Sequence, residues 1–438
     1  MKFLQKNDIF YLGKILLLYS PFIIVLLILK PKGGHEFDLF CFTEWAKFSF
    51  TEGLSNIYKS WTDYLPLYHY VLFLFGKMQG SIEEITSNIY KLKSLTLFFE
   101  FGSTLILFKL LKNKYKETYK AVFYSLFYFL NLAVLYNSLI WGQVDGIMTF
   151  FIFVAVILAY KKRFFFSLLF FVLALNLKLQ AIVFLPIIVL LILPTILDKE
   201  QIKRLICSFG GIGIIQLLIF LPFICAGDFS KLWNVITNSV GQYPKVSMNA
   251  YNMWYFFFNN PMEVSDFDKF LGITYKIWGL ILFFVMSFFA LLHFVKPFFS
   301  RLFKKIDVEY SYKKTLISCA LIPFLFFFFN TQMHERYSHP AFIFLALYAI
   351  TYKKPLVFIL GSLAYFLNLE GVLQSLQTNN YYTLVFMPLF VSCLYLLVIV
   401  LLFFDLYDIR LTLFLNQKGN IQNNNTKRQK NREKYFLK

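Results

Sequence analysis

Residues 164–193 read FFFSLLFFVLALNLKLQAIVFLPIIVLLIL, with one charged side chain, Lys178, near the middle. Lys178 divides the stretch into two runs that are too apolar for the surface of a water-soluble protein. Such runs are stable in the hydrocarbon of a membrane, where the backbone must be helical because no water is present to bond the peptide groups. The stretch therefore predicts a pair of membrane helices with Lys178 at the turn.

The same composition extends over almost the whole chain of 438 residues. Hydrophobic residues make up 58% and charged residues 15%, and the mean hydropathy is +0.61. These values exclude an ordinary soluble domain, and the apolar runs are too long for the alternating strands of a membrane barrel. A helix needs about 20 apolar residues to cross a hydrocarbon core of about 30 Å. We expect an all-α polytopic membrane protein with about 12 transmembrane helices, at residues 10–30, 88–108, 119–137, 143–160, 164–177, 180–197, 204–226, 271–295, 315–330, 338–352, 355–369 and 382–404.

The distribution of charge predicts how these helices are oriented. The formal net charge is +19, and twelve spans place the basic clusters on one side of the membrane. Lys and Arg collect in cytoplasmic loops, so that side is predicted to be the cytoplasm, and the positive charge needs no nucleic-acid partner. The clusters are at the N-terminus and at residues 109–120, 161–163, 199–204, 296–305 and 353–354, and in the tail.

The opposite side carries the long loops. Segment 31–87 has seven acidic and four basic residues and is predicted to be a large first extracytoplasmic loop. Its apolar stretch from Tyr64 to Met78 is too short for a span and predicts a juxtamembrane or re-entrant helix. We divide the chain into a transmembrane domain, 1–404, and a basic tail, 405–438, whose Asn, Gln and Lys content predicts disorder.

Five polar clusters interrupt the apolar pattern, and all map to the extracytoplasmic side. A charge at mid-bilayer costs at least about 2.5–3.5 kcal/mol on insertion scales, so such residues are candidates for function. Each cluster also has a plain structural reading: a solvated loop acid, a helix-opening proline turn, an interfacial Trp, a snorkelling Lys or an interfacial salt bridge. The clusters are His35–Asp38, Asp63–Tyr68, Asn137–Asp145, Lys178–Gln180 and Gln332–Tyr337.

Two of the clusters point most directly to a binding site. The runs that flank Lys178 have about 14 residues each and rise only about 20 Å, so Lys178 is expected to face an indented, water-filled cavity. His334 and Arg336 are adjacent at a span end, and such a pair suits a phosphate. The sequence contains no P-loop, no G-x-G-x-x-G and no paired metal-ligand motif, so we assign no cofactor and no metal site and leave metal dependence open.

Taken in order, the polar motifs resemble those of a known family. They are Asp38 with Trp45, Asp63-Tyr64 before Pro66, Tyr136–Ser138 with Trp141–Asp145, Lys178-Leu179-Gln180, Asn249–Trp254 and Met333–Tyr337. The chain resembles the membrane-embedded GT-C glycosyltransferases that use polyprenyl-phosphate sugars. The nearest resemblance is to bacterial mannosyltransferase-like proteins related to the GPI mannosyltransferases, and a more distant one is to the dolichyl-phosphate-glucose-dependent glucosyltransferases. Leu65 and Leu179 depart from the family, which usually has Pro at both positions.

The resemblance implies a GT-C-like fold and an inverting hexosyl transfer, with mannose favoured. The donor is a polyprenyl-phosphate sugar, and the acceptor hydroxyl belongs to a glycan, a glycolipid or a protein. Asp38 is expected to be the catalytic base, and His334, Arg336 and Lys178 are expected to bind the donor phosphate. We assign sugar or acceptor contacts to Asp63, Tyr64, Gln143, Asp145, Gln180, Asn249, Asn252 and Glu335. The expected location is a bacterial inner membrane, with the endoplasmic reticulum second, and an extracytoplasmic active site.

Two other classes of function are compatible with a polytopic membrane protein. A transporter or flippase of a lipid-linked or polar substrate would also have about twelve spans, but it is expected to have two related halves and coupling charges at mid-bilayer. The sequence has no evident internal repeat, and its polar clusters lie on one face. A scaffold protein would give no reason for His, Arg, Lys and Asp to gather on that face. The glycosyltransferase interpretation is favoured over both.

Overall fold

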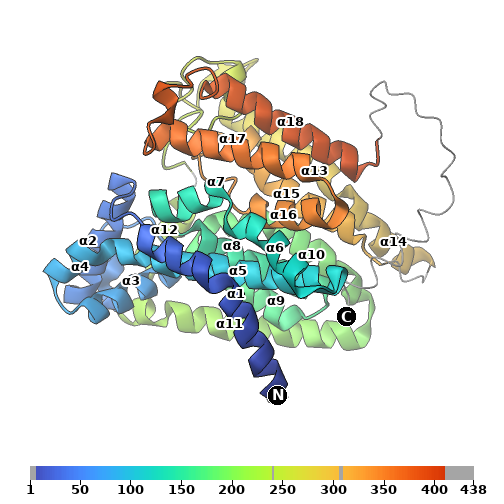
Figure 1. Ribbon diagram of the computed structural model, residues 1–438, viewed down its shortest axis with the longest axis horizontal. Helices are drawn as coiled ribbons and strands as arrows, with labels where there is room; N and C mark the ends of the chain where they lie inside the picture. The colour runs from blue at the N-terminus through green and yellow to red at the C-terminus, as the bar shows by residue number, and fades with distance from the viewer. Residues whose placement is uncertain (1–5, 239–240, 305–308, 410–438) are drawn as a thin grey trace.

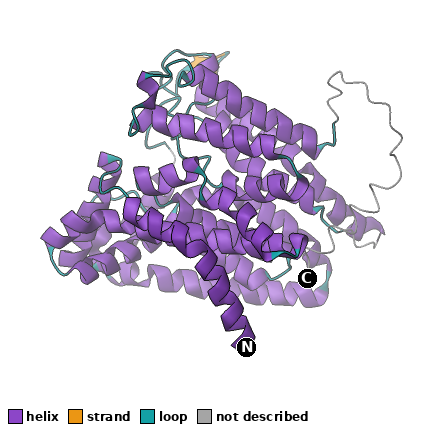
Figure 2. Cartoon of the chain, viewed as in Figure 1, coloured by secondary structure: helices purple, strands orange, loops and turns teal. Residues whose placement is uncertain are grey.

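The structure is a computed structural model that describes residues 6–238, 241–304 and 309–409 (Figure 1). It is 77% helical, and Figure 2 shows helices almost throughout. Within these ranges the strands are β1 (Lys269–Phe270) and β2 (Ile273–Thr274), which pair antiparallel. The prediction of an all-α membrane protein is confirmed. The predicted tail lies mostly outside the described residues, which end at residue 409.

A layer of short helices follows the first long helix. α3 begins with Pro66, whose missing N–H costs nothing in a first helical turn, and ends at Gly80, whose φ of 83° favours glycine. The helix expected from Tyr64 to Met78 is therefore present, and it is not among the helices long enough to cross a membrane. The elements here are α1 (Lys6–Leu29), α2 (Glu36–Glu52), η1 (Leu54–Lys59), α3 (Pro66–Gln79), α4 (Ile82–Asn88) and η2 (Ile89–Lys91).

The middle of the chain forms long helices joined by short turns. Two features interrupt this pattern: the chain bends by 51° between α6 and α7, and α7 continues into η3, a π-helix capped by Gly142. The elements are α5 (Leu92–Tyr115), α6 (Thr118–Phe129), α7 (Leu132–Leu135), η3 (Tyr136–Trp141), α8 (Asp145–Tyr160), α9 (Phe164–Leu177), η4 (Leu179–Phe184), α10 (Leu185–Ile192), η5 (Leu193–Leu197), α11 (Lys199–Cys225) and α12 (Phe229–Asn238).

The last part of the chain adds four long helices, α13, α15, α17 and α18, and two shorter ones, the basic α14 and the apolar α16. α15 is the central one, because 78% of its most apolar segment is buried, against 17% of that of α11 at the edge. The elements are η6 (Met253–Phe256), α13 (Tyr275–Leu291), η7 (Leu292–Phe294), α14 (Val295–Lys304), α15 (Tyr312–Phe329), α16 (Ala341–Tyr352), α17 (Pro355–Leu373), η8 (Thr378–Asn380) and α18 (Pro388–Leu406).

Each of the twelve predicted spans coincides with helical structure, but the count of twelve is not confirmed. Seven helices are long and apolar enough to cross a membrane, and an eighth span results if α6 and the α7–η3 segment, bent by 51°, count as one. The other four predicted spans correspond to shorter apolar helices of 10–17 residues. At 1.5 Å per residue such helices are shorter than a hydrocarbon core of about 30 Å.

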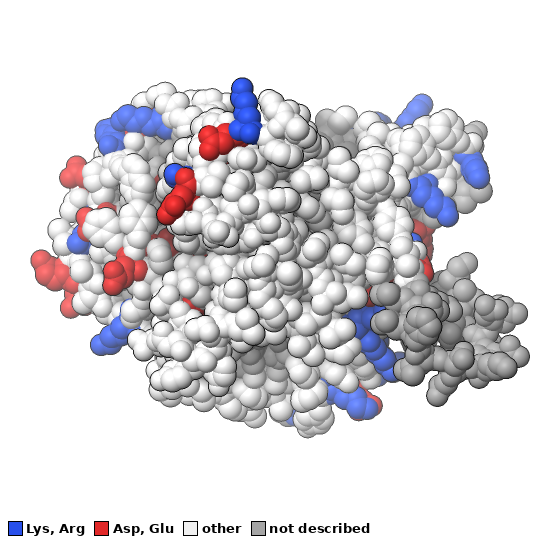
Figure 3. Space-filling view, turned by 90° about the horizontal axis from the view of Figure 1, so that it is seen from above, with Lys and Arg blue, Asp and Glu red and all other residues white. Residues whose placement is uncertain are grey.

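The long helices run side by side along the longest axis of the molecule, as Figure 1 shows, with α2, α3 and α4 at one end and α14 toward the other. On the face seen in Figure 3, Lys, Arg, Asp and Glu gather toward the two ends of this axis and leave a wide uncharged surface between them. Large apolar side chains on the outer helices, such as Leu217, Phe284 and Ile359, are exposed. This pattern is typical of a helix bundle surrounded by lipid.

Candidate functional site

The site is built around Asp38, in the first turn of α2. His35, the residue just before α2, accepts a hydrogen bond from the Asp38 backbone N–H and so caps the helix. The backbone N–H of His35 donates to the carbonyl oxygen of Trp141 at 2.9 Å. The start of α2 is therefore fixed against the π-helix η3, although about a hundred residues separate them in the chain.

Three groups from different parts of the chain approach the Asp38 carboxylate. Trp141 Nε1 donates to Oδ2 at 2.7 Å, His35 Nδ1 lies 3.0 Å from Oδ2, and Arg336 Nη2 lies 3.9 Å from Oδ1. Burial by itself raises the pKa of Asp38, but Arg336, His35 and Trp141 outweigh it and hold this pKa well below its usual range. Asp38 is therefore ionised at neutral pH.

Arg336 comes from the segment between α15 and α16. Its Nη1 donates to Glu335 Oε1 at 2.7 Å, and its guanidinium lies 5.9 Å from the ring of Trp141 and 6.0 Å from that of Tyr337. Its buried Nε has no hydrogen-bond partner among the described residues. Arg336 thus has one donor to spare beside Asp38.

Lys178 lies at the break between α9 and η4, as the sequence predicts. Its Nζ lies 2.7 Å from Asp145 Oδ1 and 3.0 Å from Gln143 Oε1, and it is 5.7 Å from the ring centre of Tyr64. The Tyr64 hydroxyl donates to the same Gln143 oxygen at 3.3 Å. Lys178, Gln143, Asp145 and Tyr64 therefore form one hydrogen-bonded group.

Asp63 belongs to the same region. Burial raises the pKa of Asp63, and Lys178 and Arg336 oppose that rise while Asp38 adds to it. These influences require that Asp63 lie within electrostatic range of all three groups. Its Oδ1 is buried without a hydrogen-bond partner among the described residues, so this carboxyl also has a free polar atom.

His334 reaches the site, but not as a cation. Burial and the charge of Arg336 lower the pKa of His334 to about 3. Arg336 therefore carries the positive charge of this pair at neutral pH, and the assignment of His334 to the donor phosphate stays a prediction. His334 supplies a neutral imidazole, which packs edge-on against Tyr243 and Tyr337.

The remaining predicted residues divide into neighbours of the site and structural residues. Glu335 is buried against Arg336, and Gln180 Nε2 donates to the carbonyl oxygen of Tyr337 at 2.6 Å. Asn249 has a φ of 67° and bridges to His334 through its backbone. Asn252 is fully buried, and its amide bonds to the backbone of Trp254, Phe327 and Asn330.

The assignment of Asn252 to a sugar contact is therefore corrected. Both polar atoms of this amide are used inside the protein, where they hold the turn at η6 against the end of α15. An Asn among aromatic residues gave no signal that distinguishes a ligand contact from a turn of this kind.

Sequence reasoning missed two features near the site. The sequence offers an interfacial position as the structural interpretation of Trp141 and assigns it no contact with Asp38, whereas the indole is 1% exposed and donates to Asp38. It also missed a buried network in which Asn137 lies 3.1 Å from Asp145 and 3.3 Å from His339, and His339 lies 3.1 Å from Glu100. Glu100 inside an apolar run was the one available signal, because an ionisable residue there needs a partner.

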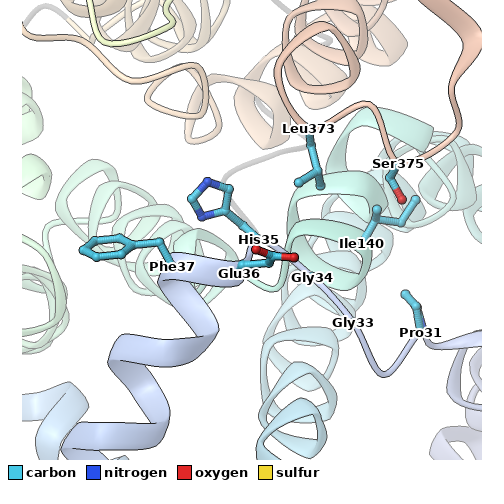
Figure 4. A pocket seen from close by; sticks show the side chains of 9 residues that line it. All are labelled: Pro31, Gly33, Gly34, His35, Glu36, Phe37, Ile140, Leu373 and Ser375. Carbon is cyan, nitrogen blue, oxygen red and sulfur yellow. The ribbon is translucent and has the colours of Figure 1, made fainter.

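A hollow of about 600 Å³ opens beside His35. Figure 4 shows it between the loop that leads into α2, Ile140 of η3 and the end of α17. Polar and apolar groups both line it: Pro31, Gly33, Gly34, His35, Glu36, Phe37, Ile140, Leu373 and Ser375. His35 links the hollow to the site, because it lines the hollow and its Nδ1 lies 3.0 Å from Asp38 Oδ2.

The arrangement combines an ionised carboxylate, which can accept a proton, with cationic side chains, which can hold an anion. Asp38, Arg336 and Lys178 are each less than 15% exposed at the side chain, so their charges act in a medium that screens them weakly. Among the described residues no group of three or more His, Cys, Asp or Glu is arranged to hold a metal ion. In comparisons with known proteins, the sequence matches no protein-family model and no curated protein.

Proposed function

We propose that the chain is an inverting glycosyltransferase of the GT-C type that moves a hexose, with mannose favoured, from a polyprenyl-phosphate carrier to an acceptor hydroxyl. The observation that carries the proposal is that Arg336 lies 3.9 Å from Asp38 and that Lys178 interacts electrostatically with both, although 298 residue positions separate Asp38 from Arg336. A carboxylate beside two cations fits a reaction in which a proton is taken from one substrate and a phosphate leaves the other.

In this proposal Asp38 removes the proton from the acceptor hydroxyl. The hydroxyl oxygen then attacks the anomeric carbon, the bond from that carbon to the phosphate oxygen breaks, and the polyprenyl phosphate leaves from the opposite face. One base suffices for such an inversion, whereas the usual retaining route needs a carboxylate nucleophile as well. The hydrocarbon-facing surfaces of the bundle give the polyprenyl chain a place outside the site.

Arg336 and Lys178 are assigned to the phosphate. Negative charge grows on the leaving oxygen, and cationic donors fixed in advance stabilise it most in the transition state. Arg336 has an unused Nε beside Asp38. A phosphate bound to Arg336 would weaken the hold of the guanidinium on Asp38, and the pKa of Asp38 would rise toward the range in which a carboxylate is an effective base. His334 would contribute a neutral hydrogen bond.

The test of the base is Asp38→Asn, which keeps the shape of the side chain and removes its basicity. We expect transfer from a panel of polyprenyl-phosphate sugars to fall by about 10²–10⁴-fold. The matched control is Glu44→Gln on the same helix, because Glu44 is exposed and, within the described residues, its ion pair is with Lys47. Release of free polyprenyl phosphate is the readout, with thermal unfolding as the check that each variant is folded.

Two results would count against the proposal. Near-normal turnover of a folded Asp38→Asn variant removes Asp38 as the base. Movement of an intact donor across vesicle membranes, without cleavage of the phosphate bond by the wild-type protein, favours a flippase instead.

A further inference from the structure

Three lysines gather beside the hollow, around the ring of Tyr90. Lys30 Nζ lies 5.4 Å and Lys32 Nζ 5.9 Å from the centre of this ring, and Lys91 is the next residue in the chain. Lys30 also donates to Ser94 Oγ at 2.5 Å. All three lysines therefore lie at or next to Tyr90.

The charge of this lysine cluster (Lys30, Lys32 and Lys91) is not neutralised within the described residues. None of the three lies within ion-pair distance of a carboxylate there, whereas Lys47 in the same loop pairs with Glu44 at 2.9 Å. The cluster also lies at the end of the bundle that carries α2, opposite the basic loops. Three adjacent cations without a counter-charge repel one another, so their arrangement favours an anion between them.

An exposed apolar strip on the last turns of α1, here called the α1 lane, ends at the lysine cluster. α1 runs along the outside of the bundle, and its last turns expose Ile24, Leu27, Ile28 and Leu29, which are 43–74% exposed. Lys30 follows directly at the end of this helix. A hydrocarbon chain that lies along α1 would therefore bring an attached anionic group to the three lysines.

On the other side of the lysine cluster is the hollow, whose lining includes Pro31, the residue between Lys30 and Lys32. Figure 4 shows the carboxylate of Glu36, the imidazole of His35 and the hydroxyl of Ser375 around it. A carboxylate and a hydroxyl bind the hydroxyl groups of a polyol or sugar, and a carboxylate repels a second anion. The hollow thus suits a neutral, hydroxyl-bearing group.

Hydrogen bonds from Lys93 fix the backbone that lines the hollow. Lys93, which is 1% exposed, donates to the carbonyl oxygens of Pro31, Gly33 and Leu139, with the Pro31 distance 3.1 Å and the Leu139 distance 2.6 Å. These bonds tie the loop that bears Lys32 to η3. A site prepared in this way loses little entropy when it is filled.

We propose that the α1 lane, the lysine cluster and the hollow together bind one membrane lipid whose phosphate carries a hydroxyl-bearing head group. The acyl chains lie along α1, the phosphate at Lys30, Lys32 and Lys91, and the head-group hydroxyls at Glu36 and Ser375. Because His35 lines the hollow and lies 3.0 Å from Asp38, this lipid is the acceptor if the proposed transfer holds, and only that last step rests on the proposed function.

The experiment measures binding of phosphatidylglycerol and phosphatidylcholine to the full chain by native mass spectrometry, without turnover. The test variant replaces Lys30, Lys32 and Lys91 by Gln, and the matched control replaces Lys47, Lys59 and Lys77 of the same loop by Gln. We expect the wild type and the control to prefer phosphatidylglycerol by at least about tenfold, and the test variant to lose this preference. Equal loss in the control, or none in the test variant, overturns the proposal.

Two further arms separate the parts of the site. Free glycerol 3-phosphate should not displace phosphatidylglycerol at an equal concentration, and displacement would mean a soluble ligand that does not use the α1 lane. Glu36→Gln with Ser375→Ala should weaken phosphatidylglycerol several-fold and leave phosphatidic acid unchanged, and equal effects on both overturn the role of the hollow. Intact lipid binding with no sugar transfer counts against the proposed function alone.

Discussion

At the scale of single residues, the buried His69 and the half-buried His334 respond to pH in a way that an exposed histidine does not. His69 is fully buried in α3, where its Nε2 lies 2.9 Å from Thr62 Oγ1 and 3.2 Å from the carbonyl oxygen of Tyr64. Burial lowers the pKa of His69 to about 3, the same value as for His334. Both are therefore neutral in the folded protein at pH values where the unfolded chain binds a proton.

We expect the stability of the protein to fall as the pH falls below about 6.5. Between pH 6.5 and 3 the unfolded state binds more protons at His69 and His334 than the folded state, so the free energy of unfolding rises with pH, by at most about 1.4 kcal/mol per pH unit for each histidine. Thermal unfolding of the detergent-solubilised protein should occur several degrees lower at pH 5 than at pH 7. His69→Gln should flatten this dependence, and an unchanged slope would contradict it.

Residue chemistry could be predicted from the sequence where an ionisable group interrupts an apolar run. Lys178 and Arg336 stand out in this way; Arg336 lies 3.9 Å from Asp38, and Lys178 interacts electrostatically with both. The charge of His334 could not be predicted, because it depends on burial and on the neighbouring guanidinium. The role of Asn252 was wrong for a similar reason, since an amide in a turn and an amide in a binding site have the same local sequence.

At the scale of elements, the loop between α1 and α2 and the π-helix η3 act as one unit. Lys93 joins them through carbonyl oxygens on both, and the His35 N–H donates to Trp141. The packing is close: a Cβ atom at Gly34 would lie 2.6 Å from the Trp141 carbonyl oxygen, whereas one at Gly33 would meet nothing within 4 Å. There is therefore room for a side chain at Gly33 but not at Gly34.

Gly34→Ala should destabilise the protein by about 1–3 kcal/mol, because the loop must move away from η3 to admit the methyl group. It should also reduce any activity that depends on Asp38, since the same contact fixes the start of α2. Gly33→Ala adds the same atoms without a clash and should be close to neutral. Thermal unfolding of the two variants, measured side by side, is the check, and equal stability of both would show that the loop and η3 are not in contact.

Helices could be predicted from the sequence more reliably than their ends and breaks. Every predicted span contains helix because hydrophobic runs of that length have no other way to satisfy their backbone. The break between α6 and α7 and the short α16 depend on tertiary packing, which hydropathy does not report. This is why twelve apolar segments were predicted correctly as helices while the number of full spans was not confirmed.

At the scale of the whole molecule, the bundle is polarised along its length. The α2 end carries Asp38, Arg336 and Lys178. Lys161 follows α8, and Lys199 follows α10 and η5; these helices run from the α2 end toward the other end of the bundle. Which end faces the cytoplasm follows from the positive-inside rule and is a prediction.

Single cysteines placed at the two ends of a cysteine-free variant test this orientation. Lys161→Cys and Lys199→Cys should react with an impermeant maleimide only after the membrane is opened, and Lys59→Cys and Asn380→Cys should react in intact cells. All four positions are exposed. Labelling of all four in intact cells would mean a mixed orientation, and the reverse pattern would place the Asp38 cluster in the cytoplasm.

The wide turn of η3 has a consequence for which changes in chain length the protein can tolerate. In a π-helix each N–H donates to the carbonyl oxygen five residues earlier, as Gly142 N–H does to Asn137 at 3.1 Å. The segment therefore contains one residue more than the same turn of an α-helix would. Loss of one residue there would let the coil tighten into an ordinary helix and swing the Trp141 indole by roughly 100° about the axis. Such a deletion would hardly change the hydropathy of the segment, but it would remove the indole donor from Asp38.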